Sequence, residues 1–143
     1  MKIERLGPGD AAAVLEASEL FDGPAHPGHT ERFLAADGHH LLTASVDGVA
    51  VGFVSGVETT HPDKGTEMFL YELSVHPDHR RRGIATALVA ALQDLARERG
   101  CYGMWVATEP DNVAAIEVYR SAGSSGPSPA VVLDWTFEGR RGD

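Results

Sequence analysis

Between residues 67 and 100, a pattern typical of a β-strand passes through a short basic loop directly into a pattern typical of a helix. The stretch "EMFLYELSV" is rich in aromatic and β-branched residues, which predicts a strand crossing the middle of a sheet. Pro77 and Gly83 end that strand within "HPDHRRRG". From Ile84 to Arg99 apolar residues recur at helical spacing, and Gly100 follows as a natural C-cap. This run predicts a sheet with a helix packed against it.

The rest of the chain predicts further strands and helices around this unit. Strands are expected from "KIERL", "HHLLTASV", "VAVGFVSGV", a buried "YGMWVAT" and a last "AVVLDWTF". Helices are expected from "AAAVLEASELF" with Asp10 as its N-cap, from "TERFLAAD" and from "NVAAIEVYRSAG". The hairpin signal Asp47-Gly48 makes the second and third strands antiparallel neighbours. The order implies a mixed sheet flanked by helices, in one α/β (α+β) domain over residues 1–138 with a short tail at 139–143.

Composition and charge exclude several classes of protein. The formal net charge of −9 repels nucleic acid and anionic membranes, and no apolar run approaches the roughly 20 residues of a membrane span. The single cysteine, Cys101, excludes an internal disulfide, and the seven histidines lack the spacing of metal ligands, so we expect no metal. The N-terminus also lacks the apolar region of a signal peptide. We therefore expect a soluble, cytoplasmic protein that binds neither nucleic acid nor membrane.

The basic loop predicts a site for a small phosphorylated ligand. A strand that runs through a short loop into a helix leaves several backbone N–H groups unpaired at the positive end of the helix dipole. Gly83 allows close approach of a ligand, and Arg80, Arg81 and Arg82 add positive charge. A solvated run of surface arginines is the alternative. Neither a Walker loop nor a dinucleotide-binding Gly-x-Gly-x-x-Gly is present, which excludes two large classes of phosphate-binding protein.

Two ordered motifs carry a resemblance to a known family. "LSVHPDHRRRGIATALV" resembles the acyl-coenzyme-A signature of the GNAT superfamily of N-acetyltransferases, whose Arg/Gln-x-x-Gly-x-Gly/Ala is matched by Arg80-x-x-Gly83-x-Ala85. "DNVAAIEVYRSAG" is similar to the second signature of that family. The resemblance implies a GNAT-like domain with a mixed, mostly antiparallel sheet and about four helices, an acyltransferase activity, and acetyl-coenzyme A as the cofactor.

The same resemblance implies which residues hold the cofactor. Main-chain amides at the start of the helix would bind its diphosphate, namely those of Arg81, Arg82, Gly83, Ile84, Ala85 and Thr86, with Arg80 to Arg82 available for the outer phosphates. The end of the preceding strand would pair its backbone with the pantetheine arm through Leu73, Ser74 and Val75. Asn112 would contact the same arm, and Tyr119 would stand near the sulfur.

Acetyl transfer to an amine needs a base for the ammonium and a proton for the departing thiolate. Tyr119 suits the second role, because a phenol is protonated at neutral pH; a tyrosine packed in the core is the alternative. Glu72 suits the first role, because its apolar neighbours should raise its affinity for a proton. A solvent-facing glutamate, or one that only binds a cationic substrate, is the alternative for Glu72. Glu109 is a second carboxylate expected at the cleft, unless it lies in the turn before Pro110.

The acceptor amine is the least constrained part of the prediction. Within the superfamily the chain is similar to the small aminoglycoside 3-N-acetyltransferases, and Asp22 and Glu31 are expected cation contacts on the far wall of the cleft. Polyamines, protein or peptide amines, and a catalytically idle acyl-coenzyme-A-binding module remain alternatives. The polar "SSGPSPA" replaces the aromatic continuation usual in the family, so the strand expected there is shortened or absent. "AVVLDWTF", with Trp135, is compatible with a homodimer through that strand.

Overall fold

The computed structural model describes residues 1–138, so the expected tail at 139–143 lies outside the described residues. The strands are β1 (Lys2–Leu6), β2 (His39–Val46), β3 (Val49–His61), β4 (Gly65–Val75) and β5 (Met104–Trp105). The helices are α1 (Ala11–Glu16), α2 (Pro27–Ala35), α3 (Ile84–Glu98) and α4 (Val113–Ser121), with short 3₁₀ turns η1 (Ser18–Leu20) and η2 (Pro77–His79).

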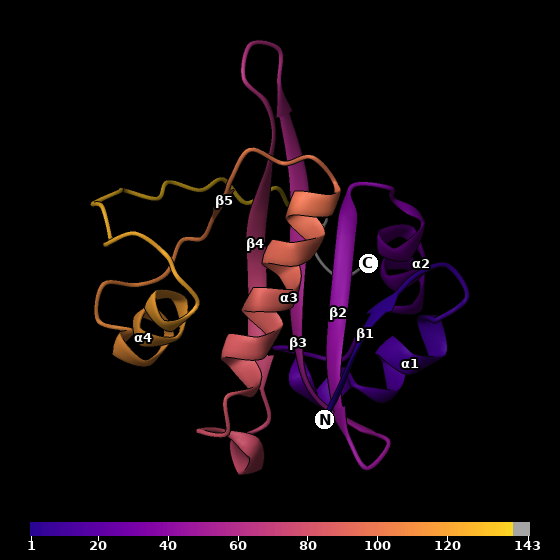
Figure 1. The fold of residues 1–143 in the computed structure, drawn as a ribbon. Coiled ribbons are helices and arrows are strands. Elements are labelled where there is room, and N and C mark those ends of the chain that lie inside the picture. Colours follow the sequence, from indigo (N-terminus) through magenta and orange to yellow (C-terminus); the bar gives the residue numbers. More distant parts are fainter. Residues whose placement is uncertain (139–143) are drawn as a thin grey trace.

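The strands form one mixed sheet in the order β1-β2-β3-β4-β5 (Figure 1). The first three pairings are antiparallel, whereas β4 and β5 are parallel. The hairpin between β2 and β3 turns at Asp47 and Gly48, which both have positive φ values, 51° and 79°, as its sequence requires. These pairings confirm the expected mixed, mostly antiparallel sheet with four helices in the described part of the chain.

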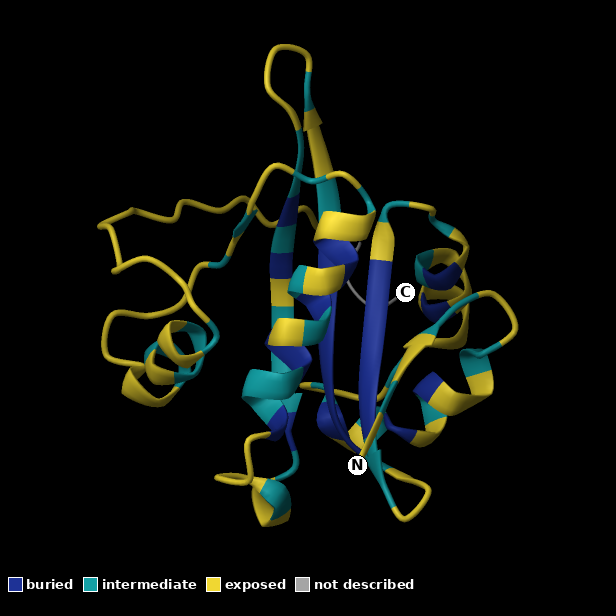
Figure 2. Cartoon of the chain, in the orientation of Figure 1, coloured by how far each residue is buried: buried dark blue, intermediate teal, exposed yellow. Residues whose placement is uncertain are grey.

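Helices cover both faces of the sheet (Figures 1 and 2). Helix α3 packs on one face, where its buried residues join a core that includes Val54, Met68 and Leu70. Helices α1 and α2 pack on the opposite face around Leu41 and Phe53. None of the four helices has the length and hydropathy of a membrane span within residues 1–138.

Two glycines of β3 explain how closely α3 approaches the sheet. A Cβ atom at Gly56 would lie 2.8 Å from the Met68 sulfur and 2.9 Å from a methyl group of Leu92. A Cβ atom at Gly52 would meet the Ser74 carbonyl oxygen at 3.0 Å and Leu88 at 3.3 Å. Because α3 rests directly on this backbone, its first turn is held at a fixed place beside the end of β4.

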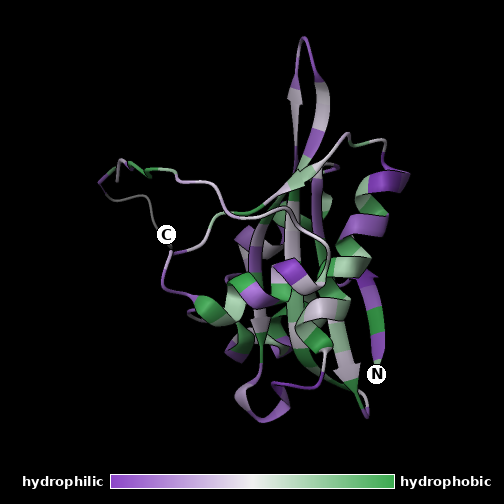
Figure 3. Cartoon of the chain, turned by 60° about the vertical axis from the view of Figure 1, so that its left-hand side comes forward, coloured by the Kyte–Doolittle hydropathy of each residue, from purple (hydrophilic) through white to green (hydrophobic). Residues whose placement is uncertain are grey.

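One strand prediction near the C-terminus holds only in part, and another is wrong. "YGMWVAT" forms only the two-residue strand β5, and Trp105 is 47% exposed because no described strand lies beyond it. "AVVLDWTF" forms no strand: residues 124–137 have no regular structure (Figure 3). Residues 131–137 are exposed (Figure 2). Pro127 and Pro129 lack a donor for a strand ladder, and in the described chain no sheet edge pairs with this segment. The polar "SSGPSPA" also forms no strand, as its composition predicted.

Candidate active site

The loop between β4 and α3 presents a row of backbone donors. Gly83 is the N-cap of α3 with a φ of 79°, and Arg81 also has a positive φ, 63°. The backbone amides of residues 81–86 have no acceptor within residues 1–138. On either side of them, the Arg80 amide donates to the Pro77 carbonyl and the Ala87 amide to the Gly83 carbonyl. Free amides in this turn, at the N-terminus of a 15-residue helix, form the concave arrangement that binds phosphate oxygens. The structure therefore fits the diphosphate of acetyl-coenzyme A.

The three arginines differ in what they do. The Arg80 Nε atom donates to the carbonyl oxygen of Val75 at 3.1 Å, so this side chain fastens the loop to the end of β4. Arg81 and Arg82 are exposed beside the free amides, where they add charge. The carbonyl oxygen of Val75, whose backbone we expected to pair with the pantetheine arm, therefore already accepts one hydrogen bond.

A cleft of about 340 Å³ lies beyond this loop, where α4 stands beside β4. Strand β5 pairs with β4 only at Met68 and Phe69. The rest of β4 as far as Val75 therefore has no neighbouring strand on its β5 side within the described chain. Three parts of the chain line the cleft: η1 with the loop after it, strands β3 and β4, and the segment around the start of α4. The lining residues are Leu20, Asp22, Phe53, Tyr71, Glu72, Leu73, Ser74, Thr108, Asn112, Ala115 and Tyr119.

A β-bulge turns Glu72 into the cleft. Met68 and Leu70 are buried against α3, and Leu73 and Val75 pack in the same core, so the α3-facing positions skip from 70 to 73. The register agrees, because Gly56 pairs with Leu70 and Ser55 with Glu72, which leaves Tyr71 as the extra residue. Tyr71 and Glu72 consequently share the face opposite α3.

The environment of Glu72 suits a base. Its side chain is half-buried, and burial raises the pKa of its carboxyl, with a further increase from the negative charge of Asp22. No salt bridge joins Glu72 to a cation within residues 1–138. A carboxylate held this way has an increased affinity for a proton and for an incoming ammonium group.

Tyr119 reaches the same cleft from α4. The residue is half-buried and packs against the core on the α3 side of the sheet. Tyr119 therefore both packs against the core, as the alternative reading expected, and lines the cleft. Burial raises the pKa of its phenol, which keeps the hydroxyl protonated at neutral pH. The structure thus brings together Glu72, Tyr119 and Asp22, three of the predicted site residues.

Asn112 lines the cleft, whereas Glu109 lies in the turn that was the alternative for it. Asn112 is the N-cap of α4: its Oδ1 atom accepts from the Ala115 amide at 3.2 Å, and its side-chain amide donates to Thr108 at 3.3 Å. Asn112 lines the cleft, but its carbonyl is already engaged. Glu109 is exposed in the turn before α4, where its backbone carbonyl accepts from the Asn112 amide, and it does not line the cleft.

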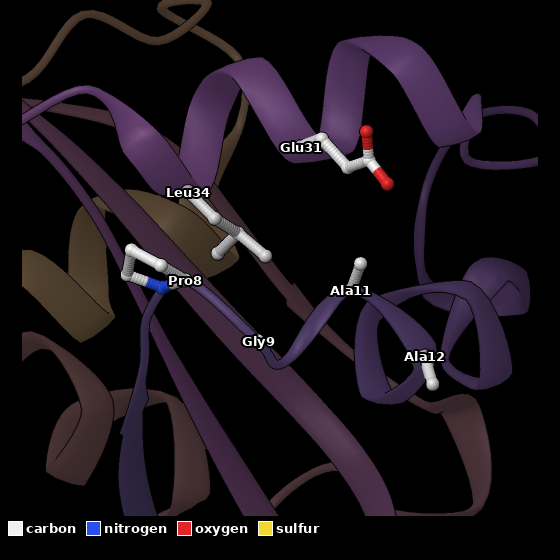
Figure 4. A pocket seen from close by; sticks show the side chains of 6 residues that line it. All are labelled: Pro8, Gly9, Ala11, Ala12, Glu31 and Leu34. Atoms are coloured by element: carbon white, nitrogen blue, oxygen red, sulfur yellow. The ribbon is translucent and has the colours of Figure 1, made fainter.

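Glu31 belongs to a different hollow. It lies on α2 and faces the start of α1 across a separate space of about 430 Å³ (Figure 4). The other residues around that space are Pro8, Gly9, Ala11, Ala12 and Leu34. The two carboxylates that we expected on one wall are therefore divided: Asp22 lines the cleft of Glu72, and Glu31 does not.

Several residues of the cleft carry no signal in the sequence. Phe53 and Tyr71 looked like ordinary strand residues, and Thr108 lies in a loop without a motif. Strict alternation along β4 would place Glu72 on the same face as Met68 and Leu70, beneath α3. No signal in the sequence marks the bulge that reverses this placement.

Comparison with known proteins identifies the family. The sequence model of the acetyltransferase (GNAT) family matches residues 12–123. An aminoglycoside N(6')-acetyltransferase type 1 from Salmonella typhimurium is 33% identical over 110 residues, which cover 68% of this chain and 75% of the relative. An acetyltransferase from Yersinia pestis (strain Pestoides F) is 39% identical over 90 residues, which cover 63% of this chain and 60% of the relative.

Solved structures share the fold over nearly the whole chain. The aminoglycoside acetyltransferase AAC(6')-Iy, in complex with the bisubstrate analogue CoA-S-monomethyl-acetylneamine, is 25% identical, with a TM-score of 0.80 and coverage of 95% of this chain and 98% of the other. An aminoglycoside acetyltransferase from an uncultured soil metagenomic sample, solved with sisomicin, has a TM-score of 0.88 at 20% identity, covers 96% of both chains and supports the fold alone.

These findings confirm the expected GNAT-like fold, an acyltransferase activity and acetyl-coenzyme A as the acetyl donor. The relatives whose names give a position name the 6′ nitrogen, rather than the 3-N position that we expected. The chain belongs to the acetyltransferase (GNAT) family.

Proposed function

We propose that this chain transfers the acetyl group of acetyl-coenzyme A to a primary amine of a polycationic small molecule, with an aminoglycoside as the acceptor. The observation that carries the proposal is the cleft itself, in which two carboxylates, Asp22 and Glu72, accompany the half-buried phenol of Tyr119. The aminoglycoside acetyltransferases among the similar proteins support this class of acceptor.

The chain would hold the donor at two places. Acetyl-coenzyme A supplies a thioester-bound acetyl group and a thiol as the leaving group. The free amides of residues 81–86 would bind its diphosphate, and the unpaired edge of β4 at Leu73 and Ser74 would bind the pantetheine arm. Asn112 would contact that arm through its side-chain amide, because its carbonyl oxygen caps α4.

Glu72 and Tyr119 would move the two protons. Glu72 would accept a proton from the acceptor's ammonium group, for which its raised pKa is favourable. The Tyr119 hydroxyl would donate to the sulfur, since burial keeps the phenol protonated. Asp22 would bind a further ammonium group of the same acceptor, which a polycationic sugar provides and a simple amine does not.

We favour the 6′ amine of an aminoglycoside over the 3-amine, because the named relatives act there. The decisive experiment measures thiol release from acetyl-coenzyme A with aminoglycosides, polyamines and peptides as acceptors. A matched pair of aminoglycosides that differ only by an amine or a hydroxyl at the 6′ position tests the regiochemistry, and NMR of the product locates the acetyl group.

Each outcome of this panel separates the alternatives. Turnover with the 6′ amine and none with the 6′ hydroxyl supports the proposal, whereas equal turnover with both points to another nitrogen, such as the 3-amine. Turnover confined to polyamines or peptides assigns a different acceptor. Tight binding of acetyl-coenzyme A without any acceptor-dependent thiol release identifies an idle acyl-coenzyme-A-binding module.

We also propose a homodimer through the apolar segment 131–137, although this segment forms no strand in the described chain. Val131, Leu133 and Trp135 are 84%, 75% and 78% exposed, and large apolar side chains exposed close together in the sequence favour association with a second copy. Light scattering after size exclusion should give a dimer for the full chain and a monomer for Trp135→Ser. A monomer for the unaltered chain refutes this proposal. The cytoplasmic location and the domain bounds 1–138 stay predictions from the sequence.

A further inference from the structure

Ser55 lies directly opposite Glu72, at the bulge between β3 and β4. In the register, Ser55 pairs with Glu72 and the next residue, Gly56, pairs with Leu70, so one residue of β4 has no counterpart on β3. A bulge of this kind interrupts the regular ladder of hydrogen bonds and is stable only where its backbone groups find partners.

The Ser55 hydroxyl supplies such a partner. Its oxygen accepts a hydrogen bond from the backbone N–H of Glu72 at 3.1 Å. Ser55 is 3% exposed, and it does not line the cleft. Its neighbours along β3, Val54 and Gly56, face α3, so the Ser55 side chain lies on the same side of the sheet as the cleft but beneath its surface.

We propose that Ser55 is a positioning residue for acetyl transfer: its hydroxyl holds the bulge of β4 in the register that keeps Glu72 and Tyr71 on the cleft face. This inference rests on the function proposed above for Glu72. Ser55 touches neither substrate, and it acts only through the backbone of Glu72. A buried serine without this role would affect stability alone.

The consequence of losing the hydroxyl follows from the surroundings of Glu72. Burial and the charge of Asp22 raise the pKa of the Glu72 carboxyl. The titratable groups that line the cleft with it are Asp22 from the loop after η1, Tyr71 beside it on β4, and Tyr119 from α4. If the bulge relaxes and Glu72 moves toward water, the raised affinity for a proton decreases, and the acidic limb of the pH profile moves to lower pH.

The kinetic test compares Ser55→Ala with Ser55→Thr, which keeps the hydroxyl. Ser55→Ala should lower kcat about tenfold, a typical consequence of losing one hydrogen bond that orients a reacting group. It should also shift the acidic limb of kcat/KM to lower pH and leave the affinity for acetyl-coenzyme A unchanged. Ser55→Thr should restore both properties. Thr43→Val is the matched control, because Thr43 is another buried hydroxyl on the neighbouring strand β2, away from the bulge.

A titration by NMR makes the test independent of turnover. The ¹³C signal of the Glu72 carboxyl, assigned by its absence in Glu72→Gln, should titrate at lower pH in Ser55→Ala than in the unaltered protein and in Thr43→Val. An unchanged Glu72 titration in folded Ser55→Ala overturns the inference. Unchanged kcat in Glu72→Gln instead refutes the role proposed for Glu72 as the base, and the titration then still decides whether Ser55 positions Glu72.

Discussion

Two glutamates on neighbouring central strands, Glu58 on β3 and Glu72 on β4, have opposite electrostatic surroundings. Burial acts on both and would raise both pKa values. At Glu58, hydrogen bonds from His40 and Arg99 outweigh burial, so the pKa of its carboxyl is lowered. At Glu72 no cation opposes burial within the described chain, and Asp22 adds to it, so the pKa is raised.

The surroundings of Glu58 form a closed network at the end of α3. The Arg99 Nε atom donates to Glu58 at 2.8 Å, and the Arg99 Nη2 atom donates to Asp37 at 3.1 Å. His40 is 1% exposed: its Nδ1 atom accepts from Arg5 at 3.0 Å, which leaves the Nε2–H group to donate to Glu58. Burial is the main reason that the pKa of His40 is lowered, so the imidazole is neutral.

The difference shows how one sheet separates stability from chemistry. Partners on several elements satisfy Glu58, which stabilises the fold because β2, β3 and the end of α3 are joined through it. The Glu72 carboxylate has no cationic partner within the described chain, so its negative charge is unfavourable in the folded protein. This lowers stability, but it leaves the carboxylate available for a proton or an ammonium group of the acceptor. Exchanging each carboxylate for an amide should therefore separate the two properties.

Replacing Glu72 by glutamine should have the largest effect on activity. Loss of the base should lower kcat by about 100-fold or more, the range for general acid–base catalysis. The melting temperature at pH 7 should stay the same or rise, because no partner of the carboxylate is lost and an unfavourable buried charge is removed. In the unaltered protein, the acidic limb of kcat/KM should lie above the ordinary range of a glutamate. Steady-state kinetics across pH checks both points. Glu109→Gln, in the exposed turn before α4, is the control, and equal kcat in the two variants would contradict the role of Glu72.

Replacing Glu58 by glutamine should have the opposite result. We expect the free energy of unfolding at pH 7 to fall by about 2 kcal/mol, between the values for exposed and buried ion pairs, with kcat unchanged. Denaturant titration measures the loss. Glu67→Gln is a matched control on a more exposed pair with His61 and should cost much less. A lower kcat with unchanged stability in Glu58→Gln would reverse the comparison.

The same network makes stability depend on pH. His40 and Glu58 both have lowered pKa values in the folded protein, so at these two groups the unfolded chain binds more protons than the folded chain as the pH falls. The stability that this network contributes should be present in full above about pH 6.5, the ordinary value for a histidine, and should decrease below it, with a further decrease below about pH 4.5 where an ordinary glutamate titrates. Unfolding curves from pH 7.5 to 4 check this order.

Local sequence signals predicted most of the fold. The Asp47-Gly48 turn and the long apolar runs determine β2 to β4 because they need no distant partner, and helical spacing with Gly100 determines α3. The free amides before α3 follow from the same local order of strand, loop and helix. The pattern also predicted a buried strand from "YGMWVAT", of which only Met104 and Trp105 form a strand. A longer strand depends on a second neighbour that covers it, and within the described chain β5 pairs with β4 alone.

The site depended on features that no local pattern carries. The bulge at Tyr71 changes the face of Glu72, and strict alternation would have placed it in the core. Asp22 and Glu31 line separate hollows, although they lie close together in the sequence, and their spacing does not reveal this separation. The contact of Arg99 with Glu58 joins residues 41 positions apart, and neither side chain has a motif that marks it.

Replacing Tyr119 by phenylalanine should have a smaller effect than the change at Glu72. We expect kcat to fall about tenfold, because water can deliver the proton less efficiently than a positioned phenol, and the affinity for acetyl-coenzyme A should change little. Calorimetry and steady-state kinetics measure the two quantities. Tyr102→Phe removes an exposed hydroxyl that bonds Glu67, away from the cleft, and serves as the control. Weaker cofactor binding with unchanged kcat would assign Tyr119 to binding alone.

Replacing Asp22 by asparagine should have the smallest effect and bears most directly on why Glu72 differs from Glu58. The lost carboxylate should raise KM for a polycationic acceptor about fivefold, the size of one partly exposed ion pair, with little change for a monoamine. Because the charge of Asp22 also raises the pKa of Glu72, the acidic limb of kcat/KM should move to lower pH in the same variant. Glu31→Gln, in the separate hollow between α1 and α2, should change neither quantity. If KM rises without any shift of the acidic limb, Asp22 binds the acceptor, and burial alone raises the pKa of Glu72.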